Sequence, residues 1–230
     1  MNNSGPDRLS WLLGGASFLV LSAAFAYSFL LAPIEASMSM LEPIQRIFYI
    51  HLPSAFVSFL GFFVVFVASI AYLVTRQLRW DWLAVSAAEV GVVFCAAVLL
   101  TGPLWAKPVW GVWWTWDARL TTTLILFLIY VGYLMLRVYV GEAHRRALLA
   151  AVVGIIGFVD VPIVYMANRW WRTNHPEPII GGGGLDPRMW VGILGVFTGA
   201  LLLASLLLRL RFRLEALRAE LMELERRAAA

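Results

Sequence analysis

The sequence contains one cysteine, Cys95, among 230 residues. A single thiol excludes an intrachain disulfide and a Cys-x-x-Cys redox pair, and the Cys-x-x-Cys-His motif that attaches a cofactor through thioethers is absent. Cys95 stands in an apolar segment, where an isolated thiol behaves as a small hydrophobic residue. We therefore expect Cys95 to be a packing residue.

Charged side chains are also scarce. They make up 14% of the chain, whereas hydrophobic residues make up 61%, which is typical of an integral membrane protein. A membrane-spanning helix needs about 20 apolar residues. The sequence supplies six such segments: Leu12–Leu31, Ile47–Thr75, Trp82–Thr101, Leu120–Leu136, Ala147–Asn168 and Met189–Leu208. We predict an all-α membrane domain over residues 1–208, whose first segment is retained because no usual cleavage site follows it.

The basic residues are distributed unevenly between the two predicted sides. Most lie in the N-terminal tail, in the loops 76–81 and 137–146, and after Leu208. The positive-inside rule then places both termini in the cytoplasm and the loops 102–119 and 169–188 in the periplasm of a bacterial inner membrane. This bias explains the net charge of +4, and nothing favours nucleic-acid binding.

Aromatic side chains are concentrated in one predicted outer loop. Four tryptophans stand within seven residues, at Trp110, Trp113, Trp114 and Trp116, and Asp117 follows them. Tryptophan anchors proteins at membrane interfaces, which is the simplest interpretation. A group of large flat rings would also suit a flat apolar ligand with a polar edge, such as a porphyrin. On a helix, the first three would share a face, although Pro103 and Pro108 argue against a helix that continues from the third span.

Only three histidines are present, and two fall on the same predicted side as the tryptophans. His51 stands at the outer end of the second span and His175 in the loop before the sixth, whereas His144 lies in a charged cytoplasmic turn. Haem iron accepts imidazole from both axial directions, and arginines pair with propionates. We predict His51 and His175 as axial ligands and Arg46 and Arg119 as propionate contacts. Interfacial snorkelling is the alternative for the arginines, and helix capping a compatible role for Asp117.

The run WGVWWTWDARLT resembles the signature of the tryptophan-rich haem-handling membrane proteins, and the pattern WGxWWxWDxRLT is complete. The segments FYIHLPSA around His51 and DVPIVYMANRWWRTNHPEP from Asp160 to Pro178 are similar to the two histidine segments of the CcmC family. The resemblance extends over essentially all six predicted spans. It implies axial ligation by His51 and His175 and a haem platform of Trp110, Trp113, Trp114 and Trp116, which Asp117 closes.

The resemblance also implies a function. Members of the family hold haem b transiently and non-covalently at the outer membrane face and deliver it to a periplasmic chaperone, CcmE, whose histidine becomes joined to a haem vinyl group. They work with the transporter subunits CcmA and CcmB and the small membrane protein CcmD during cytochrome c maturation. The chain is thus expected to be a delivery protein and not an enzyme. A membrane b-type cytochrome and a haem-transporting subunit are the alternatives.

Three further features have less specific interpretations. Glu89 and Asp160 are intramembrane acids, which form contacts to another helix or subunit or mark a path for haem. Residues 209–230 carry leucines at helical spacing and are predicted to form a cytoplasmic amphipathic helix that rests on the membrane or its own bundle, or docks on a transporter ATPase. Gly181–Gly184 are expected to form a flexible hinge near His175.

Overall fold

The computed structural model describes residues 7–34, 42–176 and 185–229 of the chain. These ranges form seven helices: α1 (Arg8–Leu30), α2 (Glu42–Gln45), α3 (Phe48–Thr75), α4 (Leu78–Trp110), α5 (Ala118–Tyr139), α6 (Ala143–Trp170) and α7 (Pro187–Ala228). All except α2 are long and apolar enough to cross a membrane, which confirms the all-helical fold and the six predicted spans. The predicted hinge Gly181–Gly184 lies outside the described residues.

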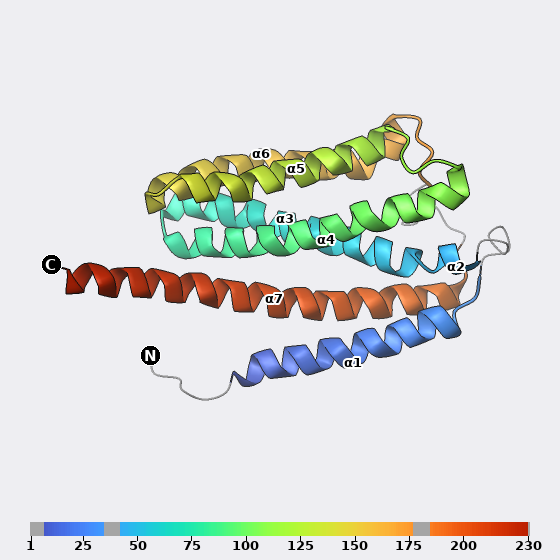
Figure 1. The fold of residues 1–230 in the computed structure, drawn as a ribbon, viewed down its shortest axis with the longest axis horizontal. Helices are drawn as coiled ribbons and strands as arrows, with labels where there is room; N and C mark the ends of the chain where they lie inside the picture. Colours follow the sequence, from blue (N-terminus) through green and yellow to red (C-terminus); the bar gives the residue numbers. More distant parts are fainter. Residues whose placement is uncertain (1–6, 35–41, 177–184, 230) are drawn as a thin grey trace.

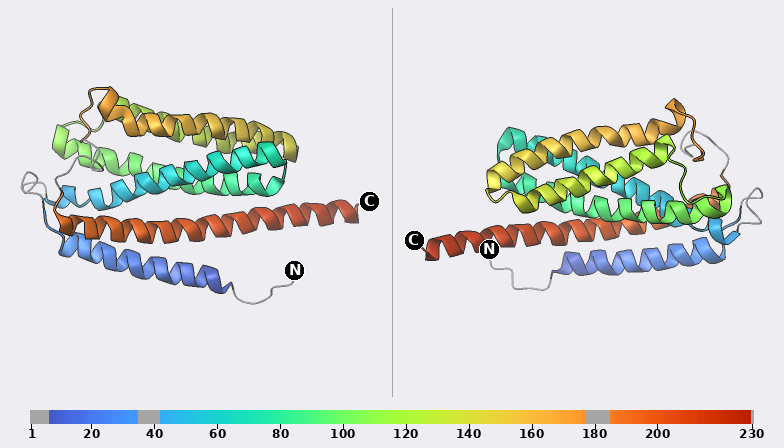
Figure 2. Two further views of the ribbon diagram at one scale, coloured as in Figure 1. Left: turned by 180° about the vertical axis from the view of Figure 1, so that it is seen from behind. Right: turned by 45° about the horizontal axis from the view of Figure 1, so that its top comes forward.

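The long helices run side by side, as Figure 1 shows. α3 and α4 occupy the middle, α5 and α6 cover one side, α7 lies on the other, and α1 packs along α7 at the edge. The start of α1 and the end of α7 lie at the same end of the bundle in every view (Figures 1 and 2), while the ends of α4 and α6 and the starts of α5 and α7 lie at the opposite end. The cytoplasmic placement of the termini stays a prediction.

Acidic residues begin four of the helices. Asp7, Asp117, Glu142 and Asp186 each accept a hydrogen bond from a backbone N–H in the first turn of the helix that follows. Free N–H groups at a helix start and the positive end of its dipole both favour an acidic cap. The capping role predicted for Asp117 is therefore confirmed, and it fixes where α5 begins relative to the tryptophan-rich segment.

The core depends on small residues and stacked rings. A Cβ on Gly61 of α3 would lie 3.1 Å from the Gly91 Cα of α4, so the missing side chain lets these two helices approach closely. The Phe62 ring of α3 stacks on Tyr130 of α5 at 3.8 Å between centroids, and the Tyr130 hydroxyl donates to the Gly154 carbonyl of α6 at 3.2 Å. These contacts join α3 to the outer pair of helices and fix the walls of the bundle.

Two predictions about α4 need correction or comment. The helix continues through Pro103 and Pro108 to Trp110, so the interruption predicted from these prolines is wrong and residues 102–110 are helical. It ends at Gly111, whose φ of 78° is one that L side chains rarely adopt. Each proline removes one backbone hydrogen bond, and its ring crowds the carbonyl four residues earlier. Contacts with neighbouring helices in a bundle can nevertheless retain the helical path. The true loop is shorter than predicted, and Trp113 and Trp114 do not share a helix face with Trp110.

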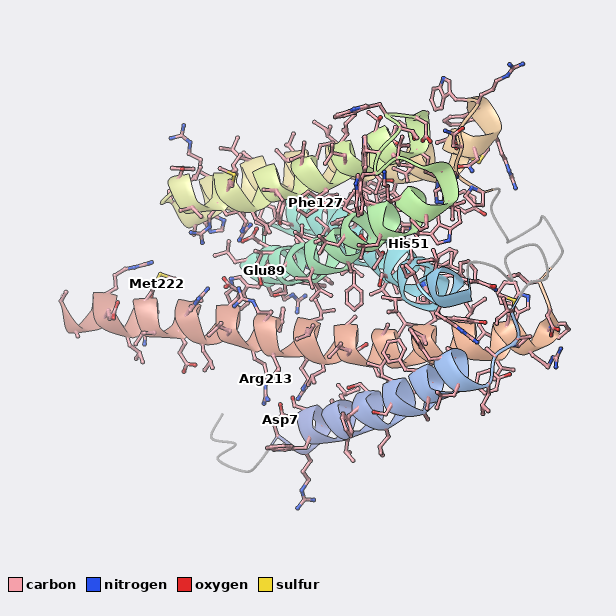
Figure 3. The ribbon with its side chains drawn as sticks, turned by 45° about the vertical axis from the view of Figure 1, so that its right-hand side comes forward. Asp7, His51, Glu89, Phe127, Arg213 and Met222 are labelled. Atoms are coloured by element: carbon pink, nitrogen blue, oxygen red, sulfur yellow. The ribbon has the colours of Figure 1, made fainter. Side chains whose placement is uncertain are left out.

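Ion pairs connect the helices away from the loop end. Glu89 of α4 pairs with Arg211 of α7, so this intramembrane acid makes a contact to another helix, one of the two predicted roles. Figure 3 shows Glu89 directed toward α7. The Asp81 carboxylate at the start of α4 accepts two hydrogen bonds from Arg137 at the end of α5, at 2.5 and 2.8 Å, and both side chains are buried.

The predicted tail helix is the continuation of α7. This helix has 42 residues, which is about 63 Å at 1.5 Å per residue and about twice the thickness of a hydrocarbon core. Arg209 and Arg213 pair with Asp7 at the start of α1, and Figure 3 labels Arg213 and Asp7. Its leucine stripe is exposed in the structure, at Leu210, Leu214, Leu217, Leu221 and Leu224. What covers that stripe stays a prediction.

Candidate functional site

A cavity of about 280 Å³ lies at the loop end of the bundle, between α3, α4 and α5. The predicted site residues that line it come from five places in the chain: His51, Trp110, Trp114, Arg119 and His175. Its other walls are mainly apolar, with Phe48, Leu52, Ala55, Phe59, Val98, Leu99, Pro103, Leu120, Val164, Leu185 and Met189 among them. The fold therefore brings both predicted ligands and two of the four predicted platform tryptophans to one apolar space.

His51 lies in the first turn of α3, beside α4 (Figure 3). Its Nδ1 atom is 2.9 Å from the Thr101 hydroxyl of α4. Gly102 follows Thr101, and a Cβ at that position would lie 3.5 Å from the His51 Cε1 atom. The imidazole is therefore fixed between helix positions that are 50 residues apart in the sequence, with its other nitrogen, Nε2, not engaged by any described residue.

His175 lies in the segment that follows α6. Its backbone N–H donates to the Thr173 hydroxyl at 2.9 Å, and its Nδ1 lies 2.9 Å from the Pro176 carbonyl oxygen. The Asn168 amide of α6 donates to the carbonyls of His175 and Pro176 at 2.9 and 2.8 Å. These bonds give the short segment a defined shape, and within the described chain the His175 Nε2 atom makes no hydrogen bond.

The two imidazole rings are neighbours at the cavity, with centroids 6.4 Å apart and planes inclined by 34°. Burial lowers the pKa of His175 from 6.5 to about 4, and the positive charge of Arg119 acts in the same direction. A lowered pKa means that His175 is neutral at physiological pH, and a neutral imidazole is the form that binds a metal. The His175 ring is thus uncharged, and in each of the two rings the Nε2 atom makes no hydrogen bond with a described residue.

The tryptophans divide into two groups. Trp110 and Trp114 line the cavity with Trp105, which contacts Trp110 edge to face at 5.3 Å between centroids. Trp113 and Trp116 are 56% and 71% exposed and do not line it. Trp116 also has a left-handed backbone, with φ of 55°, and contacts Trp114 edge to face. The haem platform stays a prediction for all four tryptophans, of which Trp110 and Trp114 line the cavity.

Asp117 joins the two loops as well as capping α5. One carboxylate oxygen accepts from the backbone N–H groups of Arg119 and Leu120, both at 3.1 Å. The other accepts from the Thr115 hydroxyl at 3.0 Å and from the Asn174 backbone N–H at 3.3 Å. Asp117 does not line the cavity, but through these bonds it ties the tryptophan-rich segment to the residue next to His175.

The two predicted propionate arginines have different surroundings. Arg119 lines the cavity and donates to the Asn168 Oδ1 atom at 2.8 Å. Arg46 is buried, its guanidinium donates to the Ser28 and Ala32 carbonyls at the end of α1, and it does not line the cavity. Arg119 therefore borders the cavity and Arg46 does not, and the propionate contact stays a prediction for both.

Three residues of the site have no counterpart in the sequence-based prediction. The sequence did not indicate Trp105, because it precedes the tryptophan cluster by five positions. It did not indicate Thr101 or Asn168, because polar residues are common at the ends of apolar spans. Helical spacing offers a signal for Thr101, since it stands one turn before Trp105.

Asp160 is buried, with its Oδ2 atom unpartnered among the described residues, and its role stays a prediction.

Comparison with known proteins extends over almost the whole chain. The family model described as Heme exporter protein C (CcmC) matches residues 4–227. Heme exporter protein C of Bradyrhizobium diazoefficiens is 36% identical over 217 residues, covering 93% of this chain and 79% of the relative. The Escherichia coli K12 protein of the same name is 35% identical over 199 residues, covering 86% and 80%. A ccmC-like mitochondrial protein of Marchantia polymorpha, named for cytochrome c biosynthesis, is 30% identical over 208 residues, covering 90% and 87%.

Proposed function

The chain belongs to the Heme exporter protein C (CcmC) family, a multi-pass membrane component of the Ccm haem-transport system, and we propose that it delivers haem to a periplasmic chaperone. Membership gives it a role in haem handling for cytochrome c maturation, as a membrane component and not a catalytic enzyme. The proposal adds that haem b is held transiently between His51 and His175 at the periplasmic face. The partners proposed are a CcmE-type chaperone, CcmA and CcmB, and CcmD.

The separation of the two imidazoles is the observation that carries this proposal. Two imidazoles bound to opposite sides of one iron, at bonds of about 2 Å, have ring centroids about 6 Å apart. The rings of His51 and His175 are 6.4 Å apart, and their Nε2 atoms are not engaged by described residues. Rings that only pack together can have similar spacing, as Phe25 and Phe29 do at 6.1 Å, so the unengaged Nε2 atoms and the shared cavity distinguish this pair. The spacing supports axial ligation of haem, which is the protein's cargo.

The surroundings of the histidines suit the rest of a porphyrin. Apolar side chains from α3, α4 and α5 form the walls, and they exclude water from the faces of a macrocycle. The buried indole N–H of Trp114 has no partner among the described residues and can donate to a polar group of the ligand. Arg119 has five N–H donors, one of which serves Asn168, so it can also hold a propionate.

The position of the site supports delivery as opposed to storage. His175 lies on a connecting segment at the end of the bundle, and the exposed rings of Trp113 and Trp116 stand close by in the loop that precedes α5. A resident cofactor of a membrane cytochrome is usually held between helices within the bilayer. A ligand held partly by a loop at the bundle end is accessible to a water-soluble partner, which a chaperone requires.

Replacing Trp114 by alanine is expected to reduce haem loading of the chaperone. Loss of an aromatic contact costs about 1 kcal/mol beyond the lost area, so haem affinity should fall by at least about fivefold. Trp11→Ala is the control, since Trp11 is an exposed tryptophan of α1 that neither belongs to the cluster nor lines the cavity. The measurement is the amount of haem joined to the chaperone in cells that express each variant. Equal loading by the two variants would reject Trp114 as a haem contact.

A further inference from the structure

Two polar residues outside the predicted ligand set hold the two histidines. Thr101 contacts the His51 ring, and Asn168 bonds the backbone of His175. We propose that Thr101 and Asn168 are positioning residues that keep the Nε2 lone pairs of His51 and His175 available to iron. The inference rests on the proposed haem ligation, and neither residue is proposed to touch the haem.

The hydrogen bonds of Thr101 determine the tautomer of His51. The Thr101 hydroxyl donates its only proton to the Ala97 carbonyl, one turn earlier in α4, at 2.7 Å. At the 2.9 Å contact with His51 the hydroxyl oxygen must therefore accept, and the His51 Nδ1 atom must carry the proton. A neutral imidazole protonated at Nδ1 has its lone pair on Nε2. The hydroxyl thus selects the tautomer that can bind iron through Nε2.

Asn168 acts on His175 through the backbone. Its amide N–H groups donate to the carbonyls of His175 and Pro176, and its Oδ1 atom accepts from Arg119. The amide orientation is consequently determined, because a flipped amide would face two carbonyls with its oxygen. The Pro176 carbonyl that Asn168 holds also lies 2.9 Å from the His175 Nδ1 atom, and a carbonyl can only accept. His175 therefore also carries its proton on Nδ1, with Nε2 free.

Thr101 and Asn168 act in different ways. Thr101 of α4 contacts the His51 ring of α3 directly, whereas Asn168 holds the backbone of the segment that carries His175. Partners of this type orient a metal-binding imidazole, and their loss typically lowers metal affinity by about 10- to 100-fold. Asn168 further connects the His175 segment to Arg119, a cavity residue on α5. The arrangement places both iron ligands under the control of side chains that sequence motifs did not indicate.

The test uses isosteric variants of the full-length protein in detergent, titrated with haemin. Thr101→Val removes the hydroxyl, Thr101→Ser retains it, and Asn168→Asp retains the acceptor for Arg119 but loses both donors. Thr122→Val is the matched control, because Thr122 makes the same bond to the carbonyl four residues earlier, at 2.8 Å, and does not line the cavity. The readouts are haemin affinity, the electron paramagnetic resonance signal of low-spin ferric haem, and the reduction potential.

We expect Thr101→Val and Asn168→Asp each to bind haemin about tenfold more weakly and to show an altered low-spin signal and potential. Thr101→Ser and Thr122→Val should resemble the wild type. Wild-type affinity and spectra in Thr101→Val and Asn168→Asp would overturn the inference, and so would an equal loss in Thr122→Val. His51→Ala distinguishes failure of the proposed ligation from failure of the proposed positioning. Normal haemin binding by His51→Ala would reject the ligation itself. Asn168→Asp provides an independent result if Thr101→Val does not accumulate.

Discussion

Replacing His51 or His175 by alanine is expected to remove stably bound haem from the purified protein. Loss of a residue that only orients a metal ligand already costs about 10- to 100-fold in affinity, so loss of the ligand should cost at least about 100-fold. Both histidines lie at the loop end of the bundle, where substitution leaves the helix contacts of the core in place. The measurement is the haem content and absorption spectrum of each variant, and added imidazole should restore part of the spectrum.

His144→Ala is the matched control for these variants. His144 lies at the opposite end of the bundle, where its carbonyl and its Nδ1 atom contact the Tyr72 hydroxyl at 3.0 and 3.3 Å. It does not line the cavity, so its replacement should leave haem content unchanged. Full haem content and an unaltered spectrum in both His51→Ala and His175→Ala would show that neither residue is an axial ligand.

The second large effect is expected at the buried ion pair between Asp81 and Arg137, where Asp81→Asn should destabilise the protein by about 3–5 kcal/mol. The Asp81 carboxylate accepts from both terminal guanidinium nitrogens of Arg137, and the exposed fractions of the two side chains are 3% and 8%. Removing one partner leaves the other charge buried and uncompensated, which is the costly case. Unfolding in detergent, followed by loss of helical circular dichroism, measures the change in unfolding free energy.

Two further variants make this prediction specific. Glu223→Gln breaks the pair with Arg227 near the end of α7, where the side chains are 48% and 73% exposed, and should change stability very little. Replacing Asp81 and Arg137 together by leucine should recover much of the loss, because no unpaired charge then stays buried. Equal stability of Asp81→Asn and Glu223→Gln would mean that the buried pair does not support the helix packing.

The elements of this fold follow closely from its sequence. Long uncharged segments leave few alternatives to spanning helices, and α3 begins one residue from the predicted start at Ile47. The prolines of α4 are the exception: Pro103 and Pro108 locally disfavour a helix, but packing against neighbours outweighs that preference. The site was predictable where it rested on rare residue types, such as two histidines on one side. The exposure of Trp113 was not, because it depends on where α4 ends.

The positioning residues Thr101 and Asn168 could not be predicted from the sequence in the same way. Thr101 and His51 are 50 residues apart, and their contact depends on the register between α3 and α4, which close packing at Gly61 and Gly91 sets. Asn168 is close to His175 in sequence, but its role depends on how the chain turns after α6. Hydrogen bonds that depend on such geometry leave no periodic pattern in the sequence.

The most direct test of the account is transfer of haem from this protein to its partner. The haem-loaded protein is incubated with a CcmE-type chaperone and the ATP-driven CcmA and CcmB subunits, and the haem on each protein is followed by absorption and by separation under denaturing conditions. The account predicts that haem leaves His51 and His175 and becomes covalently joined to the chaperone, and that a chaperone without its histidine yields no such product. Haem that stays on this chain and passes electrons to a quinone or cytochrome would contradict delivery.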